Sequence, residues 1–310
     1  MPVPGDLPLL SVVIATLNRD ETLCNTLRYF LAEETYPRFE IIVIDQSTNH
    51  DPKTLEFLSA HASRMTYVRA EYKNLPRARN EGARLARGEI VVFVDDDVEP
   101  RTGFLLGHAR PYSDPAVLGV TGPAPEPGQP LRGRAEIGDE AWTALMERRE
   151  MRFDVSFAFS AQWAAGCNMS FRRQVIDDLG GFDENFLGPL GDDAEFSYRV
   201  GKARGLIHYS PAAHLVHLKA PGGGLRDAAG EAHYVWQTAF SVNYFHFKIK
   251  VPLGLRLRMI LRAFRQQVVN RRTITNGQWL PFALAFLRGI RDSERVIRDL
   301  RGRVRSVTQL

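Results

Sequence analysis

The chain has 310 residues, of which 44% are hydrophobic and 25% are charged. These proportions are those of an ordinary globular protein, and the length suffices for one large α/β domain with an appendage or for two domains. Its two cysteines, Cys24 and Cys167, exclude a disulfide framework or a cysteine metal site. The first ten residues predict no signal peptide, and no apolar run reaches the roughly 18 residues of a membrane span. We therefore expect a cytoplasmic protein.

The net charge of +4 conceals an uneven distribution along the chain. From Lys248 to Leu310 there are 15 basic and 3 acidic residues, a net charge of +12, whereas the rest of the chain carries −8. A basic region of this kind suits an anionic membrane surface or another polyanion. Nucleic acid is not expected, because the aromatic residues of this region are grouped with aliphatic residues and not with basic ones.

Strand patterns alternate with helix patterns over the first 121 residues. Runs of β-branched and apolar residues predict five strands, at residues 10–15, 40–44, 65–68, 90–94 and 117–121. Helices are expected between them, at residues 20–32, 52–62, 77–87 and 102–109. We expect Asn18 or Asp20 to cap the first helix. This alternation predicts an α/β fold of the Rossmann-like type, a mostly parallel sheet flanked by helices with right-handed crossovers.

Polar residues follow three of these strands where each strand ends. Thr16 follows the first strand, Asp45 the second, and Asp95, Asp96 and Asp97 the fourth. Since the carboxyl ends of parallel strands share one edge of a sheet, these residues should converge in a nucleotide-binding cleft. Asp45 can accept a hydrogen bond from the imide of a pyrimidine base, or it can simply cap a turn.

The three consecutive carboxylates are the most informative feature of the sequence. They repel one another unless a cation or a ligand's donor groups compensate their charge. A hard divalent metal ion that holds a diphosphate is one interpretation, and a solvated acidic turn is the alternative.

Two later segments also carry candidate functional residues. Asp192 or Asp193 should begin a helix, where a carboxylate can face a substrate hydroxyl or merely complement the helix dipole. In the extended segment 213–218, His214 and His217 should face opposite sides, so that only one of them can reach a metal ion. Residues 123–138 should form a loop and 140–151 a charged helix.

The basic C-terminal region should be helical beyond Arg226. One apolar face is expected at helical spacing, made by Leu253, Leu257, Ile260, Leu261, Phe264 and Val268. Such a basic amphipathic helix can lie on a membrane. It can equally pack on the catalytic domain, or on another subunit. Packing on another subunit would make the protein a homo-oligomer.

Five segments together resemble the inverting family 2 glycosyltransferases with the GT-A fold, over about residues 10–226. They are SVVIATLNR, EIIVIDQST, ARNEGARLARGEIVVFVDDD, GDDAEFSYR and PAAHLVHL. Gln46 stands where the family often has a second acid, and Asp192 where Glu is usual. The resemblance implies a GT-A domain at residues 1–225, followed by a basic amphipathic helical region at residues 226–310.

The resemblance also implies the roles of individual residues. Thr16, Asp45 and Arg79 would bind the nucleotide, and Asp95 its ribose. Asp97 and His217 would hold Mn²⁺ or Mg²⁺, and Asp193 would be the general base of an inverting transfer.

It further implies substrates and a location. The donor would be a nucleoside-diphosphate sugar, with the UDP or dTDP type favoured, and the acceptor a glycan or a lipid-linked molecule. The reaction would belong to polysaccharide or glycoconjugate synthesis for the cell envelope, in the cytoplasm or at the inner face of the membrane.

Two other functions are compatible with parts of the pattern. A sugar-nucleotide nucleotidyltransferase would need a glycine-rich basic loop after the first strand, but the sequence there is Leu-Asn-Arg-Asp, residues 17–20. A non-catalytic nucleotide or carbohydrate sensor would not need to retain Asp97, Asp193 and His217 together.

Overall fold

The computed structural model describes residues 7–147, 151–187, 191–220, 222–224 and 230–307. The contacts between residues divide the chain into two compact units. The first comprises residues 1–73, 77–182 and 196–223, and the second comprises residues 74–76, 183–195 and 224–310.

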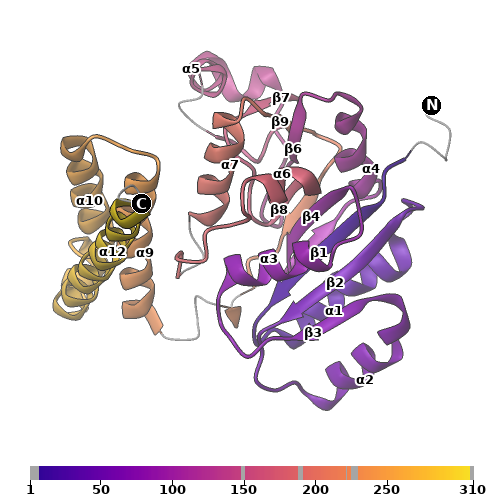
Figure 1. Ribbon diagram of the computed structural model, residues 1–310, viewed down its shortest axis with the longest axis horizontal. Coiled ribbons are helices and arrows are strands. Elements are labelled where there is room, and N and C mark those ends of the chain that lie inside the picture. The colour runs from indigo at the N-terminus through magenta and orange to yellow at the C-terminus, as the bar shows by residue number, and fades with distance from the viewer. Residues whose placement is uncertain (1–6, 148–150, 188–190, 221, 225–229, 308–310) are drawn as a thin grey trace. The chain divides into compact units, whose positions relative to one another are not determined.

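The first unit is built on the parallel strands that the sequence predicts (Figure 1). They are β1 (Leu10–Thr16), β2 (Phe39–Asp45), β3 (Thr66–Arg69) and β4 (Ile90–Asp95). β1 lies between β2 and β4 and is parallel to both, while β3 is parallel to β2. Thr16 lies opposite Asp45, and Ala15 lies opposite Asp95. The carboxyl ends of β1, β2 and β4 therefore meet at one edge of the sheet.

The sheet continues beyond β4 with mixed strand directions. Its order is β3-β2-β1-β4-β8-β6-β9-β7. The added strands are β6 (Val117–Thr121), β7 (Phe159–Ala161), β8 (Asn168–Arg172) and β9 (Leu206–Tyr209). β8 is antiparallel to β4 and β6, β9 is parallel to β6, and β7 is antiparallel to β9. The mostly parallel α/β sheet is thus confirmed.

Helices bury both faces of this sheet. The strands alternate their side chains between two hydrophobic clusters, as expected for a period of two residues. The first cluster joins Val12, Val43 and Val92 to Leu27 of α1 (Asp20–Arg28) and Phe104 of α4 (Phe104–Ala109). The second joins Val13, Ile42 and Val91 to Ala78 of α3 (Leu75–Leu85), Val175 of α6 (Arg173–Asp178) and Phe196 of α7 (Asp192–Lys202). α2 (Pro52–Ala60) follows β2 and contacts α1.

Two predictions about helices were wrong in detail. Arg19 occupies the N-cap of α1 without a side-chain hydrogen bond, and Asn18 is in the left-handed region with a φ of 53°. Neither Asn18 nor Asp20 is therefore the cap. The charged helix begins earlier than expected, as α5 (Arg134–Met146), because Gly138 with a φ of 74° joins two short helical segments across a kink. The expected end of this helix, at residues 148–151, falls largely outside the described residues.

A small antiparallel ribbon crosses the carboxyl edge of the sheet. It pairs β5 (Val98–Pro100) with β10 (Leu215–His217), and places His217 opposite Val98. The other side of β10 is held by the chain after β6, because His217 N–H donates to Pro125 O at 3.0 Å and Leu215 N–H to Pro123 O at 3.1 Å. This pairing brings His217 beside the turn that follows β4.

A buried hydrogen-bond network holds the two chain segments that lead into and pair with β10. The Asn168 amide donates to Pro123 O at 2.9 Å and to Ala213 O at 2.8 Å. Its oxygen lies 2.9 Å from His108 Nε2, and His108 Nδ1 lies 2.9 Å from Ser170 Oγ. Because the Asn168 oxygen must accept, His108 is the neutral tautomer that carries its proton on Nε2. Complete burial lowers the pKa of His108 to about 4, although the bond to Asn168 opposes this shift.

The second unit is a helical bundle. It contains α9 (Gly230–Lys248), α10 (Leu253–Gln267), α11 (Arg271–Thr275) and α12 (Trp279–Val307). α9 packs against both α10 and α12. At the α9–α12 crossing, a Cβ added to Gly289 would lie 2.3 Å from the Trp236 carbonyl oxygen. None of the described helices is both long enough and apolar enough to span a lipid bilayer.

The apolar face predicted for residues 253–268 is divided between two environments. Ile260, Phe264 and Val268 pack into the bundle core. Leu253, Leu257 and Leu261 remain 50–61% exposed. The apolar face expected from the sequence is therefore present on one helix, but α10 turns only part of it into the bundle core.

Candidate active site

The turn between β4 and β5 positions the three acidic side chains differently. Asp95 ends β4 with 31% of its side chain exposed, whereas only 2% of the Asp97 side chain is exposed. Asp96 is also buried. Two of the three carboxylates are thus removed from water, which a solvated acidic turn does not explain.

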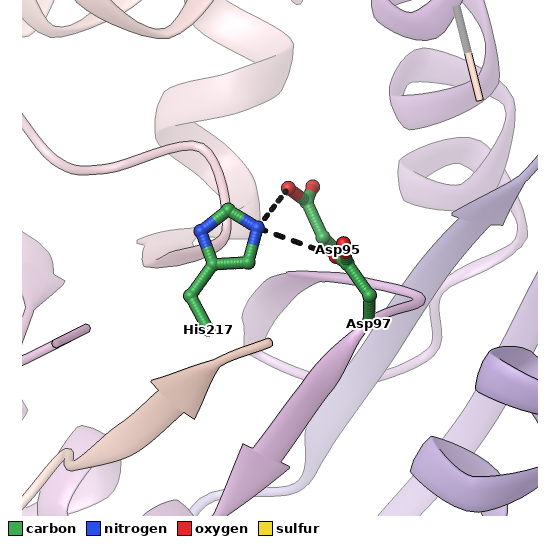
Figure 2. A group of neighbouring side chains, drawn as sticks. All are labelled: Asp95, Asp97 and His217. Carbon is green, nitrogen blue, oxygen red and sulfur yellow. Dashed lines mark ion pairs between the residues drawn. The ribbon is translucent and has the colours of Figure 1, made fainter. Parts of the chain in front are cut away.

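Asp95, Asp97 and His217 form a compact cluster (Figure 2). His217 Nε2 lies 3.3 Å from Asp97 Oδ1 and 3.8 Å from Asp95 Oδ2. One ligand atom from each residue lies within 4.8 Å of the others. Asp97 Oδ1 is buried and makes no hydrogen bond. Two carboxylates and an imidazole are a suitable donor set for Mn²⁺ or Mg²⁺, so the cluster can hold the divalent ion that the sequence predicts.

Strand alternation decides which histidine reaches the acids. Leu215 faces the sheet core and His217 faces Asp97, whereas His214 lines a separate hollow of about 490 Å³ together with Glu99 and Arg101. The structure therefore brings His217, and not His214, to the acidic turn.

The electrostatics of the cluster favour a cation. Burial raises the pKa of Asp97, but the neighbouring His217 and Arg19 outweigh it and lower that pKa to about 2. Burial lowers the pKa of His217, but its contacts with Asp97 and Cys167 raise it to about 10. The raised pKa of His217 reflects the negative charge gathered around it, and a divalent ion bound by the same side chains would offset that charge.

Arg19 was not among the predicted site residues, yet it holds two of the acids. Its Nη1 lies 2.8 Å from Asp96 Oδ1 and 3.0 Å from Asp97 Oδ2. Asp96 also accepts a hydrogen bond of 2.5 Å from Thr16 Oγ1. Burial raises the pKa of Asp96 to about 6 despite the opposing charge of Arg19. The only signal in the sequence was a basic residue just after a strand that ends at this edge.

The chain after His217 is fastened to the same acids. Ala220 N–H donates to Asp97 Oδ2 at 2.9 Å, and Arg19 Nε donates to Gly222 O at 3.1 Å. Gly223 has a φ of 76°, and a Cβ there would lie 2.3 Å from the Asn18 carbonyl oxygen. Only glycine permits this close approach.

Asp45 lies at the predicted edge, but its carboxylate is fully engaged. It is completely buried, and Oδ1 accepts from Ser47 N–H at 2.8 Å. Oδ2 is hydrogen-bonded to Tyr67 and His50. Burial lowers the pKa of His50, but its bonds to Asp20 and Asp45 raise that pKa overall. Recognition of a base by Asp45 stays a prediction, and it requires one of these donors to be displaced.

The remaining predicted residues fall into two groups. Thr16 and Arg79 lie at the acidic turn, with Arg79 Nη2 3.6 Å from Asp95 Oδ1 and 3.0 Å from Gly166 O. Asp193 belongs to the second unit, in the first turn of α7, where its Oδ1 accepts from Ala194 N–H at 2.8 Å. Its role as general base stays a prediction.

The sheet, the ribbon and the acidic cluster define a class of protein with known members. Residues 11–180 match the family model described as glycosyl transferase family 2. The chain therefore belongs to this family, and its fold is the GT-A fold of glycosyltransferases.

Individual relatives agree with this assignment. The chain is 32% identical over 229 residues to a validoxylamine A glucosyltransferase of Streptomyces hygroscopicus subsp. limoneus, covering 64% of this chain and 50% of the relative. It is 28% identical to polypeptide N-acetylgalactosaminyltransferase 12 of Mus musculus, covering 78% of this chain and 46% of the relative. The chain spans about half the length of these curated relatives.

Solved structures show the same fold. The mannosyltransferase PcManGT from Pyrobaculum calidifontis, in complex with GDP-Man and Mn²⁺, superposes with a TM-score of 0.56 at 18% identity, covering 93% of this chain and 86% of that one. GalNAc-T7 with UDP, GalNAc and Mn²⁺ superposes with a TM-score of 0.58 at 20% identity, covering 78% and 51%.

Proposed function

We propose that this chain is a metal-dependent, inverting glycosyltransferase. It moves a sugar from a nucleoside-diphosphate sugar to a hydroxyl of a glycan or lipid-linked acceptor, in polysaccharide or glycoconjugate synthesis. Family membership supports glycosyl transfer. The observation that carries the metal dependence is the buried Asp97 Oδ1, which makes no hydrogen bond and faces His217.

In this proposal Asp97 and His217 hold the metal ion, with Asp95 beside them at the ribose of the donor. When bound, Mn²⁺ or Mg²⁺ supplies a Lewis acid that offsets the negative charge on the departing nucleoside diphosphate. Arg19 keeps Asp97 Oδ2 occupied, which would leave Oδ1 available to the ion. Thr16, through Asp96, fixes the other side of the same turn.

The donor is proposed to bind at the carboxyl edge of β1, β2 and β4. Asp45 and Arg79 would contact the nucleotide there, and a UDP- or dTDP-sugar is favoured because the Asp45 carboxylate suits a pyrimidine imide. The mannosyltransferase from Pyrobaculum calidifontis was solved with GDP-Man and GalNAc-T7 with UDP. A guanine donor is therefore the alternative that a donor panel must include.

Asp193 is proposed as the general base. A sugar hydroxyl is a poor nucleophile until a positioned carboxylate accepts its proton. The freed oxygen then attacks the anomeric carbon on the face opposite the leaving group, which inverts the configuration. Asp193→Asn keeps the size of the side chain but removes the base. We expect this variant to bind donor with nearly unchanged affinity and to lose transfer by at least about a hundredfold. Unchanged turnover would refute the assignment.

A panel of sugar nucleotides with Mn²⁺ or Mg²⁺ tests the proposed function directly. Release of nucleoside diphosphate supports glycosyl transfer or donor hydrolysis. Release of pyrophosphate would indicate a nucleotidyltransferase, and binding without turnover would indicate a sensor. NMR of the product's anomeric proton then distinguishes inversion from retention. We place the reaction in the cytoplasm, at the inner face of the membrane, where a lipid-linked acceptor would be found.

A further inference from the structure

The second unit exposes more large apolar side chains than a freely soluble helical bundle requires. Most of the exposed large hydrophobic residues of the described chain lie on α10, α11 and α12 or on their connections. On α12 they are Trp279, Leu280, Leu284 and Leu287, with 50–62% of each residue exposed. Leucines exposed to this degree, and grouped on one helix, mark an interaction surface.

The exposed residues of α12 form a single stripe. Leu280, Leu284 and Leu287 recur at steps of four and three residues, and Arg291, Arg295 and Arg298 continue the same steps. The opposite side of the helix carries Phe282, Phe286 and Ile297, which are buried in the bundle. We call the six exposed residues the α12 stripe. Its first half is apolar, and its second half carries three arginines, of which Arg291 also pairs with the neighbouring Asp292 at 3.2 Å.

A similar pairing of leucine with arginine occurs on α10. Leu253, Leu257 and Leu261 are exposed at steps of four residues. Arg258, Arg262 and Arg265 are exposed on the same helix, and no ion pair joins them to an acid within the described part of the chain. Exposed leucine and arginine residues thus occur together on both α10 and α12.

Charge decides which partner fits the stripe. Residues 248–310 carry 15 basic and 3 acidic residues, so two copies of this chain would repel one another across this region. An anionic lipid surface attracts the arginines and accepts the leucines below its headgroups. A fluid surface also accommodates a convex helix, whereas a protein partner needs a complementary shape.

We propose that the α12 stripe docks on an anionic lipid bilayer. Leu280, Leu284 and Leu287 enter the boundary between headgroups and acyl chains, and Trp279 lies at the level of the headgroups. Arg291, Arg295 and Arg298 remain at the anionic surface. Because apolar and basic residues occupy successive halves of one stripe, α12 meets the membrane obliquely, with its N-terminal half deeper. Docking does not depend on the transfer reaction.

Vesicle flotation of the full chain tests this proposal. The vesicles are phosphatidylcholine alone, or phosphatidylcholine with about one third phosphatidylserine. Two triple variants are compared, one with Leu280, Leu284 and Leu287 changed to Ser, and one with Arg291, Arg295 and Arg298 changed to Gln. The matched control changes the exposed Leu55 and Leu85 of the first unit to Ser. Because all changed residues are exposed, we expect each variant to fold, and circular dichroism checks this.

We expect the native chain to float with the anionic vesicles and not with the neutral ones. Each triple variant should lower the partition about tenfold or more, and the control should not change it. Absence of binding to anionic vesicles would overturn the proposal, as would binding that the leucine variant leaves unchanged. A native dimer that the leucine variant converts to monomer would show instead that a second copy covers the stripe. Donor hydrolysis measured without vesicles reports on the proposed function separately.

Discussion

The buried oxygen of Asp97 is the feature that distinguishes this acidic turn from an ordinary one. Asp97→Ala removes one ligand of the cluster and leaves His217 beside Asp95 alone. We expect the variant to lose metal-dependent donor binding by about a hundredfold or more. Calorimetric titration of donor with and without Mn²⁺ measures this loss. Asp139→Ala, at a carboxylate whose side chain is 94% exposed, is the control, and full affinity in Asp97→Ala would contradict the metal assignment.

Arg19 neutralises the turn from the other side. Its removal should therefore make the stability of the turn depend more strongly on a bound metal ion. Arg19→Gln leaves Asp96 and Asp97 buried without their cation. Breaking a buried ion pair of this kind costs about 3 kcal/mol of folding stability. Because a divalent ion supplies positive charge to Asp97, we expect Mn²⁺ to restore part of the lost thermal stability.

Thermal unfolding with Mn²⁺ and with a chelator measures this rescue. Arg87→Gln, at an exposed ion pair with Glu40, provides the control and should lose little under either condition. An equal loss in Arg19→Gln with and without Mn²⁺ would show that the two cations act independently.

His108 makes stability depend on pH. Its pKa is about 4 in the folded chain and 6.5 when unperturbed, so the unfolded chain binds more protons between these values. Protonation of His108 therefore favours the unfolded chain in this range. Its contribution to the free energy of unfolding is complete above pH 6.5 and is lost as the pH falls toward 4. The loss amounts to at most about 3 kcal/mol. We expect the difference in unfolding free energy between the native chain and His108→Gln to shrink over this range. A difference that stays constant with pH would contradict the burial of a neutral His108.

At the level of elements, sequence periodicity predicted the strands and the faces of their residues, but it did not predict the side-chain contacts between distant elements. The strands β1, β4 and β6 agree with their predicted ranges within a residue, because unbroken β-branched runs have few other ways to be buried. Alternation along residues 213–218 also placed His214 and His217 on opposite sides, as the structure has them. The convergence of Thr16 and Asp95 followed from strand direction alone.

Contacts between side chains from distant elements left no comparable trace in the sequence. The hydrogen bonds to Asp45 Oδ2 come from His50, which lies on a loop, and from Tyr67, which lies on the neighbouring strand β3. The division of the α10 face depends on where α9 and α12 pack, and no periodicity within α10 encodes it. Local patterns therefore predicted the elements, and tertiary contacts decided the details of the site.

The crossing of α9 and α12 can be tested with two glycines. In Gly289→Ala the new Cβ would lie 2.3 Å from the Trp236 oxygen and 3.0 Å from Ala239 Cβ, so the helices must separate. We expect a net loss of about 1–2 kcal/mol, since overpacking outweighs the better helix propensity of alanine. Gly254→Ala has no atom within 4 Å and should stabilise α10 slightly. Thermal unfolding followed by circular dichroism compares them, and an unchanged Gly289→Ala would indicate a looser crossing.

For the whole molecule, the family match and the interaction surface fall on different parts of the chain. The family model covers residues 11–180, which include the acidic turn but none of α9, α10 or α12. The strongly basic residues 248–310 lie entirely outside it. The proposed membrane contact therefore lies outside the residues that the family model covers, and so do Asp193 and His217 of the proposed site. In our proposals, salt should weaken vesicle binding, because screening acts on exposed arginines, and should affect donor binding less at a buried cluster.

The pairing of β5 with β10 also determines when the cluster of Asp95, Asp97 and His217 can form. Asp97 and His217 are 120 positions apart, and this short ribbon pairs the segments that carry them. Closing so long a segment is entropically costly, so contacts of this kind form late in folding. A chain emerging from the ribosome carries its acidic turn long before its histidine is made. Under our proposal, the complete set of metal ligands is therefore available only after β10 has paired with β5.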